Sequence, residues 1–293
     1  MKTIATLIAA CWICTATATE SQQEEITAYE GYRLVWHDEF NGEGRLSDDW
    51  SYEKGFVRNH ELQWYQQDNA RLSGGCLVIE GRKERVANPH YDAGSESWQH
   101  NREYAEYTSS CVITQGRQEF RYGRFEVRAK IPVASGAWPA IWLLGNRWEW
   151  PNNGEIDMLE YYIKNGQPSI LANACWGSPR RWEAVWDESV TPFTHFTSKD
   201  PDWADKFHVW RMDWDKDFIR LFLDDELLNT IELSKTANQG FQGNRHNPFS
   251  NDEEGFGAYI LLNLAIGSNG GTPDDKAFPL KYLIDYVRVY QKM

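Results

Sequence analysis

Short apolar runs separated by turn residues recur along most of the chain, and hardly any stretch shows the 3.6-residue period of an amphipathic helix. Residues 125–131 alternate strictly between apolar and charged side chains, which predicts a strand with one face in the core and one in water. The predicted strands lie at 34–40, 76–81, 107–113, 123–131, 139–144, 154–163, 169–176, 207–213, 218–223, 257–265 and 282–290. Many short strands with turns between them indicate an all-β fold, a two-sheet sandwich or jelly roll.

Residues 154–162, with the sequence GEIDMLEYY, place three carboxylates among large apolar side chains. Because side chains alternate along a strand, Glu155 and Asp157 share a face and Glu160 would point to the other. A β-bulge between Asp157 and Glu160 would return Glu160 to the shared face, and bulges are frequent beside active sites. The stretch therefore predicts a bulged strand that carries three acids on one surface.

Three carboxyls this close cannot all be ionised at neutral pH, so one is pushed towards its protonated form while another stays an anion. Two carboxyls about 5–5.5 Å apart serve as nucleophile and general acid in a retaining glycosidase. The alternatives are a solvated acidic strand or a metal site. The interleaved Ile156, Met158 and Leu159 argue against a solvated strand.

The run GEIDMLE resembles the active-site signature of glycoside hydrolase family 16, in the bulged form Glu-x-Asp-x-x-Glu typical of laminarinase-like members. Further segments resemble the family in the expected order: GRFEVRAKIP at 123–132, GAWPAIWLLG at 136–145, LLNLAIG at 261–267 and IDYVRVY at 284–290. The resemblance implies a concanavalin A-like jelly roll with a concave substrate cleft and no cofactor for the chemistry. It also implies that Glu155 is the nucleophile, Glu160 the acid/base and Asp157 the residue that tunes their charge.

Amide, acidic and aromatic side chains are the candidates for sugar binding. The resemblance carries Asn59 and Glu61 over as contacts in the glycone subsites, and Asn263 as a residue that faces the cleft. Trp138 and Trp142 lie four apart on a predicted strand and so share a face, which lines either the sugar groove or the core. Trp176, on the strand after the three acids, is the remaining predicted contact.

Two departures from the family pattern affect the predicted substrate. Cys175 stands where relatives usually carry a histidine, and residues 267–271 lack a tryptophan that laminarinases often place there. Motif resemblance favours an endo-β-1,3-glucanase, whereas the departures favour an endo-β-galactosidase acting on β-galactans or on host O-glycan poly-N-acetyllactosamine. A non-catalytic glycan-binding protein and a transglycosylase are further alternatives, although binding proteins typically lose the acids. We expect loops 84–106 and 178–206 to shape the pocket.

The net charge and the aromatic content indicate which class of molecule the protein binds. The formal net charge of −13 argues against nucleic acid, whose phosphates require a basic surface, and against a highly sulfated glycan. Fifteen Trp, fourteen Tyr and thirteen Phe are more than a core needs, and aromatic rings offer flat faces for sugar stacking. We therefore expect a monomer that binds a neutral β-linked polysaccharide or oligosaccharide.

The N-terminal residues predict export. Residues 1–18 combine a lysine, a short apolar run and Ala16-Thr17-Ala18, as in a secretory signal peptide. Residues 19–32 are polar and acidic and predict a tether, followed by one catalytic domain at 33–293. An Ile-Ala-Ala-Cys string ending at Cys11 resembles a lipoprotein box, which would give a surface lipoprotein instead of a secreted or periplasmic protein. No apolar run reaches the roughly 20 residues that span a bilayer.

Three cysteines and one acid raise structural alternatives. Cys76 and Cys111 fall in two strands that could be neighbours, so they form one disulfide or remain two buried thiols. Cys175 is expected to be a neutral, non-catalytic thiol, because a cleft with three carboxylates disfavours a thiolate. Asp285 lies in an apolar strand. The resemblance to family 16 implies that it joins backbone carbonyls in binding a structural Ca²⁺ on the convex side.

Overall fold

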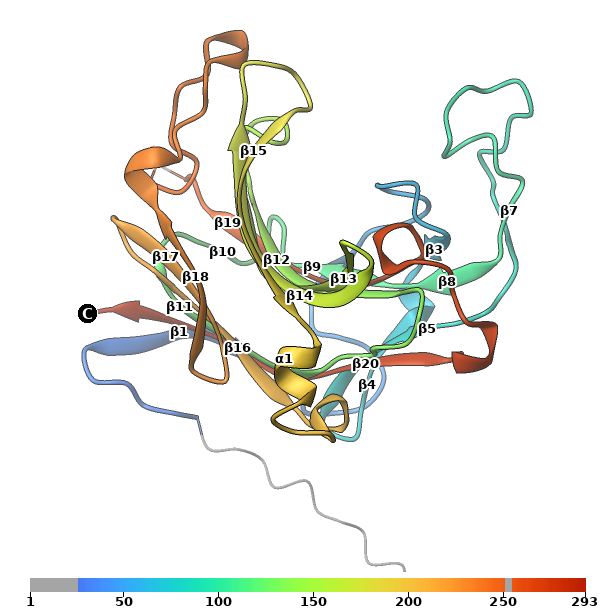
Figure 1. Cartoon of the computed structure of the whole chain (residues 1–293), viewed down its shortest axis with the longest axis horizontal. Helices are drawn as coiled ribbons and strands as arrows, with labels where there is room; N and C mark the ends of the chain where they lie inside the picture. The colour runs from blue at the N-terminus through green and yellow to red at the C-terminus, as the bar shows by residue number, and fades with distance from the viewer. Residues whose placement is uncertain (1–25, 251–254) are drawn as a thin grey trace, which may run out of the picture.

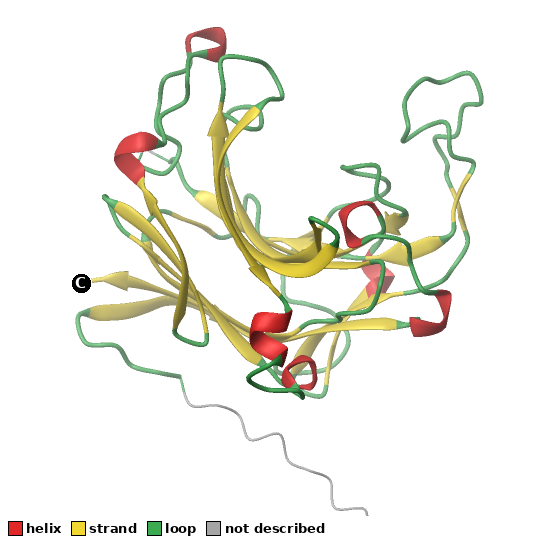
Figure 2. Ribbon diagram, in the orientation of Figure 1, coloured by secondary structure: helices red, strands yellow, loops and turns green. Residues whose placement is uncertain are grey.

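Two large antiparallel β-sheets pack face to face in the computed structural model, which describes residues 26–250 and 255–293 (Figures 1 and 2). The outer sheet has the order β18-β17-β16-β11-β20-β5-β4, and β1 also pairs with β20. Its strands are β1 (Tyr32–Asp38), β4 (Ala70–Ser73), β5 (Cys76–Gly81), β11 (Gly123–Lys130), β16 (His208–Trp214), β17 (Phe218–Leu223), β18 (Glu226–Glu232) and β20 (Leu280–Lys292). The all-β sandwich expected from the sequence is confirmed.

The inner sheet curves strongly and has the order β15-β14-β13-β12-β19-β9-β2, with β10 paired to β19 (Figure 1). Its strands are β2 (Ser51–Tyr52), β9 (Cys111–Ile113), β10 (Glu119–Phe120), β12 (Ala137–Gly145), β13 (Glu155–Lys164), β14 (Gln167–Gly177), β15 (Ala184–Pro192) and β19 (Ala258–Ile266). Two small sheets pair β3 (Gln63–Tyr65) with β8 (Tyr107–Ser109), and β6 (Val86–Ala87) with β7 (Tyr104–Ala105). The sheet curvature leaves a concave face on the side away from the outer sheet.

Helices are short throughout the described part of the chain. The α-helix α1 (Thr194–Thr197) is one turn long. The 3-10 turns are η1 (Gln67–Asn69), η2 (Trp203–Asp205), η3 (Leu233–Lys235), η4 (Phe241–Gly243), η5 (Ser268–Gly270) and η6 (Asp275–Ala277). No helix among these is long and apolar enough to cross a membrane.

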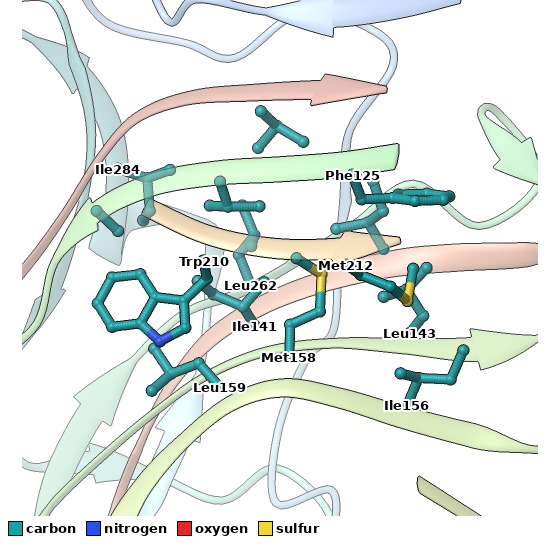
Figure 3. Close-up of a cluster of buried hydrophobic side chains, with 14 of the residues drawn as sticks. Phe125, Ile141, Leu143, Ile156, Met158, Leu159, Trp210, Met212, Leu262 and Ile284 are labelled. Carbon is teal, nitrogen blue, oxygen red and sulfur yellow. The ribbon is translucent and has the colours of Figure 1, made fainter. Parts of the chain in front are cut away.

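The hydrophobic core fills the space between the two sheets. On β11, Phe125 and Val127 are each 1% exposed and point inward, while Arg124 points outward and pairs with Asp213. The inner sheet contributes residues such as Ile156, which lies among the core side chains in Figure 3. Each large apolar side chain buried in this way contributes roughly 1.5–3 kcal/mol to stability.

The predicted β-bulge is present on β13. Trp142 on β12 pairs with Asp157, but the preceding Ile141 pairs with Leu159, so Met158 is an extra residue on β13. The side chains of Met158 and Leu159 both enter the core (Figure 3). The next residue, Glu160, returns to the concave face, where it lines the cleft. The bulge therefore places Glu160 on the same face as Asp157.

Of the two alternatives for Cys76 and Cys111, the structure agrees with free thiols, because Cys76 lies on β5 of the outer sheet and Cys111 on β9 of the inner sheet. Both are free thiols. One residue of the predicted tether contacts the domain: Tyr29 donates a 2.5 Å hydrogen bond to Oε1 of Glu126 and packs edge-on against Tyr290. The predicted signal peptide and Cys11 lie outside the described residues.

Candidate active site

The concave face of the inner sheet holds a cleft that brings most of the predicted site residues together. Its lining comes from β12, β13, β15 and β19, from η5 and from the segment before β3. The lining residues are Arg58, Asn59, Glu61, Trp138, Ala140, Trp142, Leu144, Trp150, Glu155, Asp157, Glu160, Tyr162, Trp186, Asn263 and Asn269. Eight of the ten predicted site residues are in this set, whereas Trp176 and Asp285 are not.

The Glu155 carboxylate is held by a tryptophan that the sequence analysis did not select. Trp150 donates a 2.8 Å hydrogen bond from Nε1 to Oε2 of Glu155. Trp150 lies in the segment between β12 and β13, five residues before the acid it contacts. A tryptophan closely preceding the acidic run was therefore a usable signal in the sequence.

Two side chains hold Glu160 from neighbouring strands. Trp138 on β12 donates a 3.0 Å hydrogen bond from Nε1 to Oε1, and Asn173 on β14 donates a 3.2 Å hydrogen bond from Nδ2 to Oε2. The Asn173 amide is oriented in turn, because its Oδ1 accepts a hydrogen bond from the backbone N–H of Ser189. Glu160 therefore has a fixed position, with both oxygens contacted by donors.

Burial raises the pKa of all three acids, but by different amounts. The pKa of Glu160 rises to about 8, first through burial and then through the charge of Glu155. Burial and then the charges of Glu155 and Glu160 raise the pKa of Asp157 well above its usual range. Burial also raises the pKa of Glu155, but the hydrogen bond from Trp150 and the charge of Arg58 oppose that rise. The cleft thus favours the protonated forms of Asp157 and Glu160, while the Trp150 hydrogen bond and the Arg58 charge favour the ionised form of Glu155.

Asp157 lies between the other two acids and is 2% exposed. It shares a hydrogen bond with Glu155, which raises the pKa of Asp157 and lowers that of Glu155. Its buried Oδ2 has no hydrogen-bond partner among the described residues, a costly arrangement for a charged carboxylate. These features indicate a neutral Asp157 that shares its proton with Glu155.

The predicted glycone contacts form a hydrogen-bonded row at one side of the cleft. Glu61 is 3% exposed and accepts hydrogen bonds from Asn59 Nδ2 at 3.3 Å and from Gln63 Nε2 at 2.6 Å. Gln63 in turn accepts the backbone N–H of Ile266 through Oε1 at 2.7 Å. The row ties the loop that carries Asn59 and Glu61 to the end of β19.

Aromatic side chains form the floor beside this row. Trp142 donates a 2.7 Å hydrogen bond from Nε1 to Oδ1 of Asn263, and Asn263 donates a 3.0 Å hydrogen bond to the hydroxyl of Tyr65. The guanidinium carbon of Arg58 lies 5.0 Å from the centroid of the Trp142 ring. Among the described residues that line the cleft, Arg58 alone is cationic, and its ion pair with Glu53 keeps it in place.

Trp176 does not reach the cleft. Alternation along β14 places Asn173 and Cys175 on the concave face, so Trp176 points the other way and packs in the core between the sheets. Cys175 pairs with Glu155 across the strands and is fully buried. Burial, followed by the charges of the nearby acids, raises the pKa of its thiol, so Cys175 is neutral.

Asp285, the residue predicted to bind calcium, lies outside the cleft and pairs with an arginine. It lies on β20, where its Oδ2 accepts a 2.7 Å hydrogen bond from Nη1 of Arg128. A Ca²⁺ ion needs six to eight oxygen ligands. The described residues contain no group of three or more acidic, histidine or cysteine side chains that could hold a metal. The calcium site, in which backbone carbonyls would join Asp285 as ligands, therefore stays a prediction.

The two loops expected to shape the pocket contribute little to its lining. Of the described residues that line the cleft, Trp186 alone comes from 178–206 and none comes from 84–106. Residues 84–106, which include β6 and β7, rise beside one end of the inner sheet, and β15 rises at the other (Figure 1). These segments flank the cleft and leave its floor to the inner sheet.

The fold and this cleft match a known enzyme family. The sequence profile described as "Glycosyl hydrolases family 16" matches residues 64–250. The chain belongs to this family. The hydrolases of family 16 need no cofactor for their chemistry, so side chains of the cleft carry the reaction.

Three similar proteins act on different glycans. A β-glucanase from Rhodothermus marinus is 32% identical over 89% of the chain and 85% of its own length. A solved structure from work on endo-acting O-glycanases, which prominent human gut bacteria express to initiate mucin breakdown, is 38% identical, with a TM-score of 0.78 over 92% of the chain and 94% of its own. A keratan-sulfate endo-1,4-β-galactosidase from Sphingobacterium multivorum is 27% identical over 89% of the chain and 55% of its own length. This family 16 protein is an endo-acting β-glycan hydrolase.

Proposed function

We propose that this family 16 hydrolase cuts internal β-galactosidic linkages in neutral O-glycan chains of the mucin type, with retention of configuration. The main support for the substrate is the likeness to the mucin-directed O-glycanase structure, with 38% identity and a TM-score of 0.78. The keratan-sulfate galactosidase adds a second relative that acts on a galactose-containing chain. The observation that supports the mechanism is the bulge on β13, which brings three acids to one face, one of them with a pKa raised to about 8.

In the first step the ionised Glu155 attacks the anomeric carbon and forms a glycosyl ester as the glycosidic bond breaks. Glu160 gives its proton to the departing oxygen, which a group with a pKa of about 8 holds at neutral pH. Asp157 keeps its own proton in the hydrogen bond to Glu155 and limits the negative charge of the pair. The three acids thus have separate roles.

In the second step Glu160, now ionised, removes a proton from water, and the resulting nucleophile attacks the anomeric carbon of the ester. The ester bond breaks, the sugar leaves with its original β configuration and Glu155 returns as a carboxylate. The net reaction adds one water across one internal bond. Transfer to a second sugar in place of water would use the same groups.

Sugar binding is assigned to the polar row and the aromatic floor. Asn59 and Glu61 offer an amide and a carboxylate to sugar hydroxyls, and their hydrogen bond to each other keeps both oriented. Trp142 and Trp138 line the cleft beside the acids, where rings can contact the C–H faces of sugars. The exposed ring of Trp186 on β15 provides a further surface.

A glycan panel tests the substrate. The protein is incubated with neutral and sulfated β-glucans, β-galactans, keratan-type chains and mucin glycans, and product sizes are read by mass spectrometry, with Glu155→Gln as the inactive control. We expect oligosaccharides from neutral galactose-containing chains and little monosaccharide at early times. The second candidate, supported by the β-glucanase relative, is a β-1,3-glucan. Faster cleavage of laminarin than of every galactose-containing chain would replace the first proposal with the second.

Export and a monomeric state complete the proposal. The signal-like residues 1–18 support secretion or transfer to the periplasm, and Cys11 supports a lipid-anchored variant of the same location. Edman sequencing of the natural mature protein separates these, because a chain that starts at Thr19 supports cleavage after Ala18 and a blocked Cys11 supports lipidation. Size-exclusion chromatography with light scattering should give the mass of one chain.

A further inference from the structure

The segment 84–106 lines no part of the cleft, yet one of its arginines contacts the loop that carries two proposed sugar ligands. Arg102 donates from Nη1 to the backbone carbonyl of Glu61 at 2.6 Å and from Nη2 to the carbonyl of His60 at 3.2 Å. Asn59 and Glu61, on either side of His60, both line the cleft. One guanidinium therefore binds the backbone from behind while the flanking side chains face the sugar site.

The bound backbone has an unfavourable conformation. Asn59 and His60 have φ values of 57° and 53°, both in the left-handed region. Residues other than glycine adopt this conformation uncommonly, although asparagine and histidine do so more often than most. Two consecutive residues of this kind need external support, and the hydrogen bonds from Arg102 supply it to the adjoining carbonyls.

Arg102 is itself held by aromatic rings and not by an acid. Its guanidinium carbon lies 5.0 Å from the ring centroid of Phe56 and 5.1 Å from that of Trp98. The His60 ring contacts Trp98 with a centroid distance of 4.8 Å, so the same cluster reaches the loop a second time. Burial lowers the pKa of Arg102, and no charge from a described carboxylate offsets this. Its charge is directed at the loop carbonyls.

We propose that Arg102 is a positioning residue that holds the 59–61 loop in its sugar-binding conformation, and that segment 84–106 sets glycone affinity through this contact. The consequence for affinity rests on the proposed roles of Asn59 and Glu61. Arg102 lies behind the glycone ligands, and none of the three acids is hydrogen-bonded to it. Its loss should therefore weaken binding of remote sugars and leave bond cleavage intact.

The test compares Arg102→Met, Arg102→Lys and the control Arg85→Met. Arg85 lies on the same segment but is exposed, stacking on Tyr104 and pairing with Glu106. On the longest neutral oligosaccharide that the wild type cleaves, Arg102→Met should raise KM roughly ten- to hundredfold, the effect of losing hydrogen bonds from a charged group. The kcat value should stay within about twofold, and Arg102→Lys, which cannot form the same fork, should be intermediate. Arg85→Met should match the wild type.

Hydrogen exchange of residues 56–66, followed by mass spectrometry, reads the loop without a substrate. Exchange should be faster in both Arg102 variants and unchanged in Arg85→Met. Unchanged exchange in the Arg102 variants would overturn the positioning role, as would a kcat that falls as much as KM rises. Faster exchange with an unaltered KM would keep the positioning role and instead remove Asn59 and Glu61 as sugar ligands. Arg102→Lys retains the charge and the aliphatic part of the side chain. Both the kinetics and the hydrogen exchange can therefore be measured on this variant if Arg102→Met does not fold.

Discussion

The indole Nε1 of Trp150 lies 2.8 Å from Oε2 of Glu155 and donates a hydrogen bond to it. This contact, together with the charge of Arg58, favours the ionised form of Glu155 in a cleft where burial disfavours charge. The Glu160 oxygens also receive donors, but the charge of Glu155 adds to burial and raises the pKa of Glu160 to about 8. The proposed roles, Glu155 as the nucleophile and Glu160 as the proton donor, rest on this difference between their pKa values.

The first prediction concerns Trp150→Phe, which keeps the ring and removes the donor. The pKa of Glu155 should then rise, so the acidic limb of the pH profile of kcat/KM should move to higher pH by about one unit. The alkaline limb should stay near pH 8, because it follows Glu160. Initial rates between pH 4 and pH 10 measure both limbs. A uniform loss of rate with neither limb displaced would remove Trp150 as the residue that favours Glu155 ionisation.

The second prediction concerns proton donation by Glu160. Glu160→Ala should lose at least about a hundredfold on natural glycans, whose leaving groups need a proton. It should lose much less in the first step on an aryl glycoside with an acidic phenol as leaving group. Burst kinetics with the aryl substrate isolate that step. Equal losses on both substrates would indicate a structural role for Glu160.

The bulge and the acid cluster were predictable because they depend on local sequence: alternation along one strand misplaces Glu160, and one extra residue corrects it. The same alternation along a strand puts Trp176 on the face opposite to Asn173. The wrong prediction that Trp176 lines the cleft was therefore avoidable. The sheet that each cysteine-bearing strand joins could not be predicted in the same way. The positions of Cys76 and Cys111 depend on pairings between distant segments, which local periodicity does not encode.

The contacts of Arg102 also depend on tertiary structure. Arg102 is 41 residues from the carbonyl that it binds, and its surrounding sequence has no periodic pattern that indicates a partner. The hydrogen bond from Arg128 to Asp285 likewise joins two adjacent strands, β11 and β20, whose pairing local sequence does not show. Sequence therefore defined the reacting groups better than the groups that support them.

The third prediction concerns stability. The pKa of Glu160 rises from its ordinary 4.5 to about 8 on folding. Between these pH values the folded state holds a proton that the unfolded state has lost, so the free energy of unfolding falls as pH rises, by at most about 1.4 kcal/mol per pH unit. Glu160→Gln has no such proton and should gain stability relative to the wild type at pH 8 but not at pH 4. Urea denaturation at both pH values measures this, and a pH-independent difference would contradict it.

The fourth prediction concerns Cys175, whose thiol is neutral and fully buried beside Glu155. Cys175→Ser should keep most activity, because no thiolate takes part in the reaction. Cys175→His should lower activity on the natural glycan by crowding the cleft near Glu155. Kinetics of both purified variants, with circular dichroism to verify folding, provide the test. A folded but inactive Cys175→Ser would show that the thiol has a chemical role.

The fifth prediction tests the assignment of Glu155 as nucleophile and Glu160 as acid/base most directly. Two successive displacements at the anomeric carbon release the new reducing end in the β configuration. Proton NMR of a reaction started with concentrated enzyme resolves the two anomeric signals before the sugar mutarotates. We predict that the β signal appears first and that the α signal grows only later, at the rate of mutarotation. Initial release of the α anomer would contradict the account, because it would require a single displacement by water.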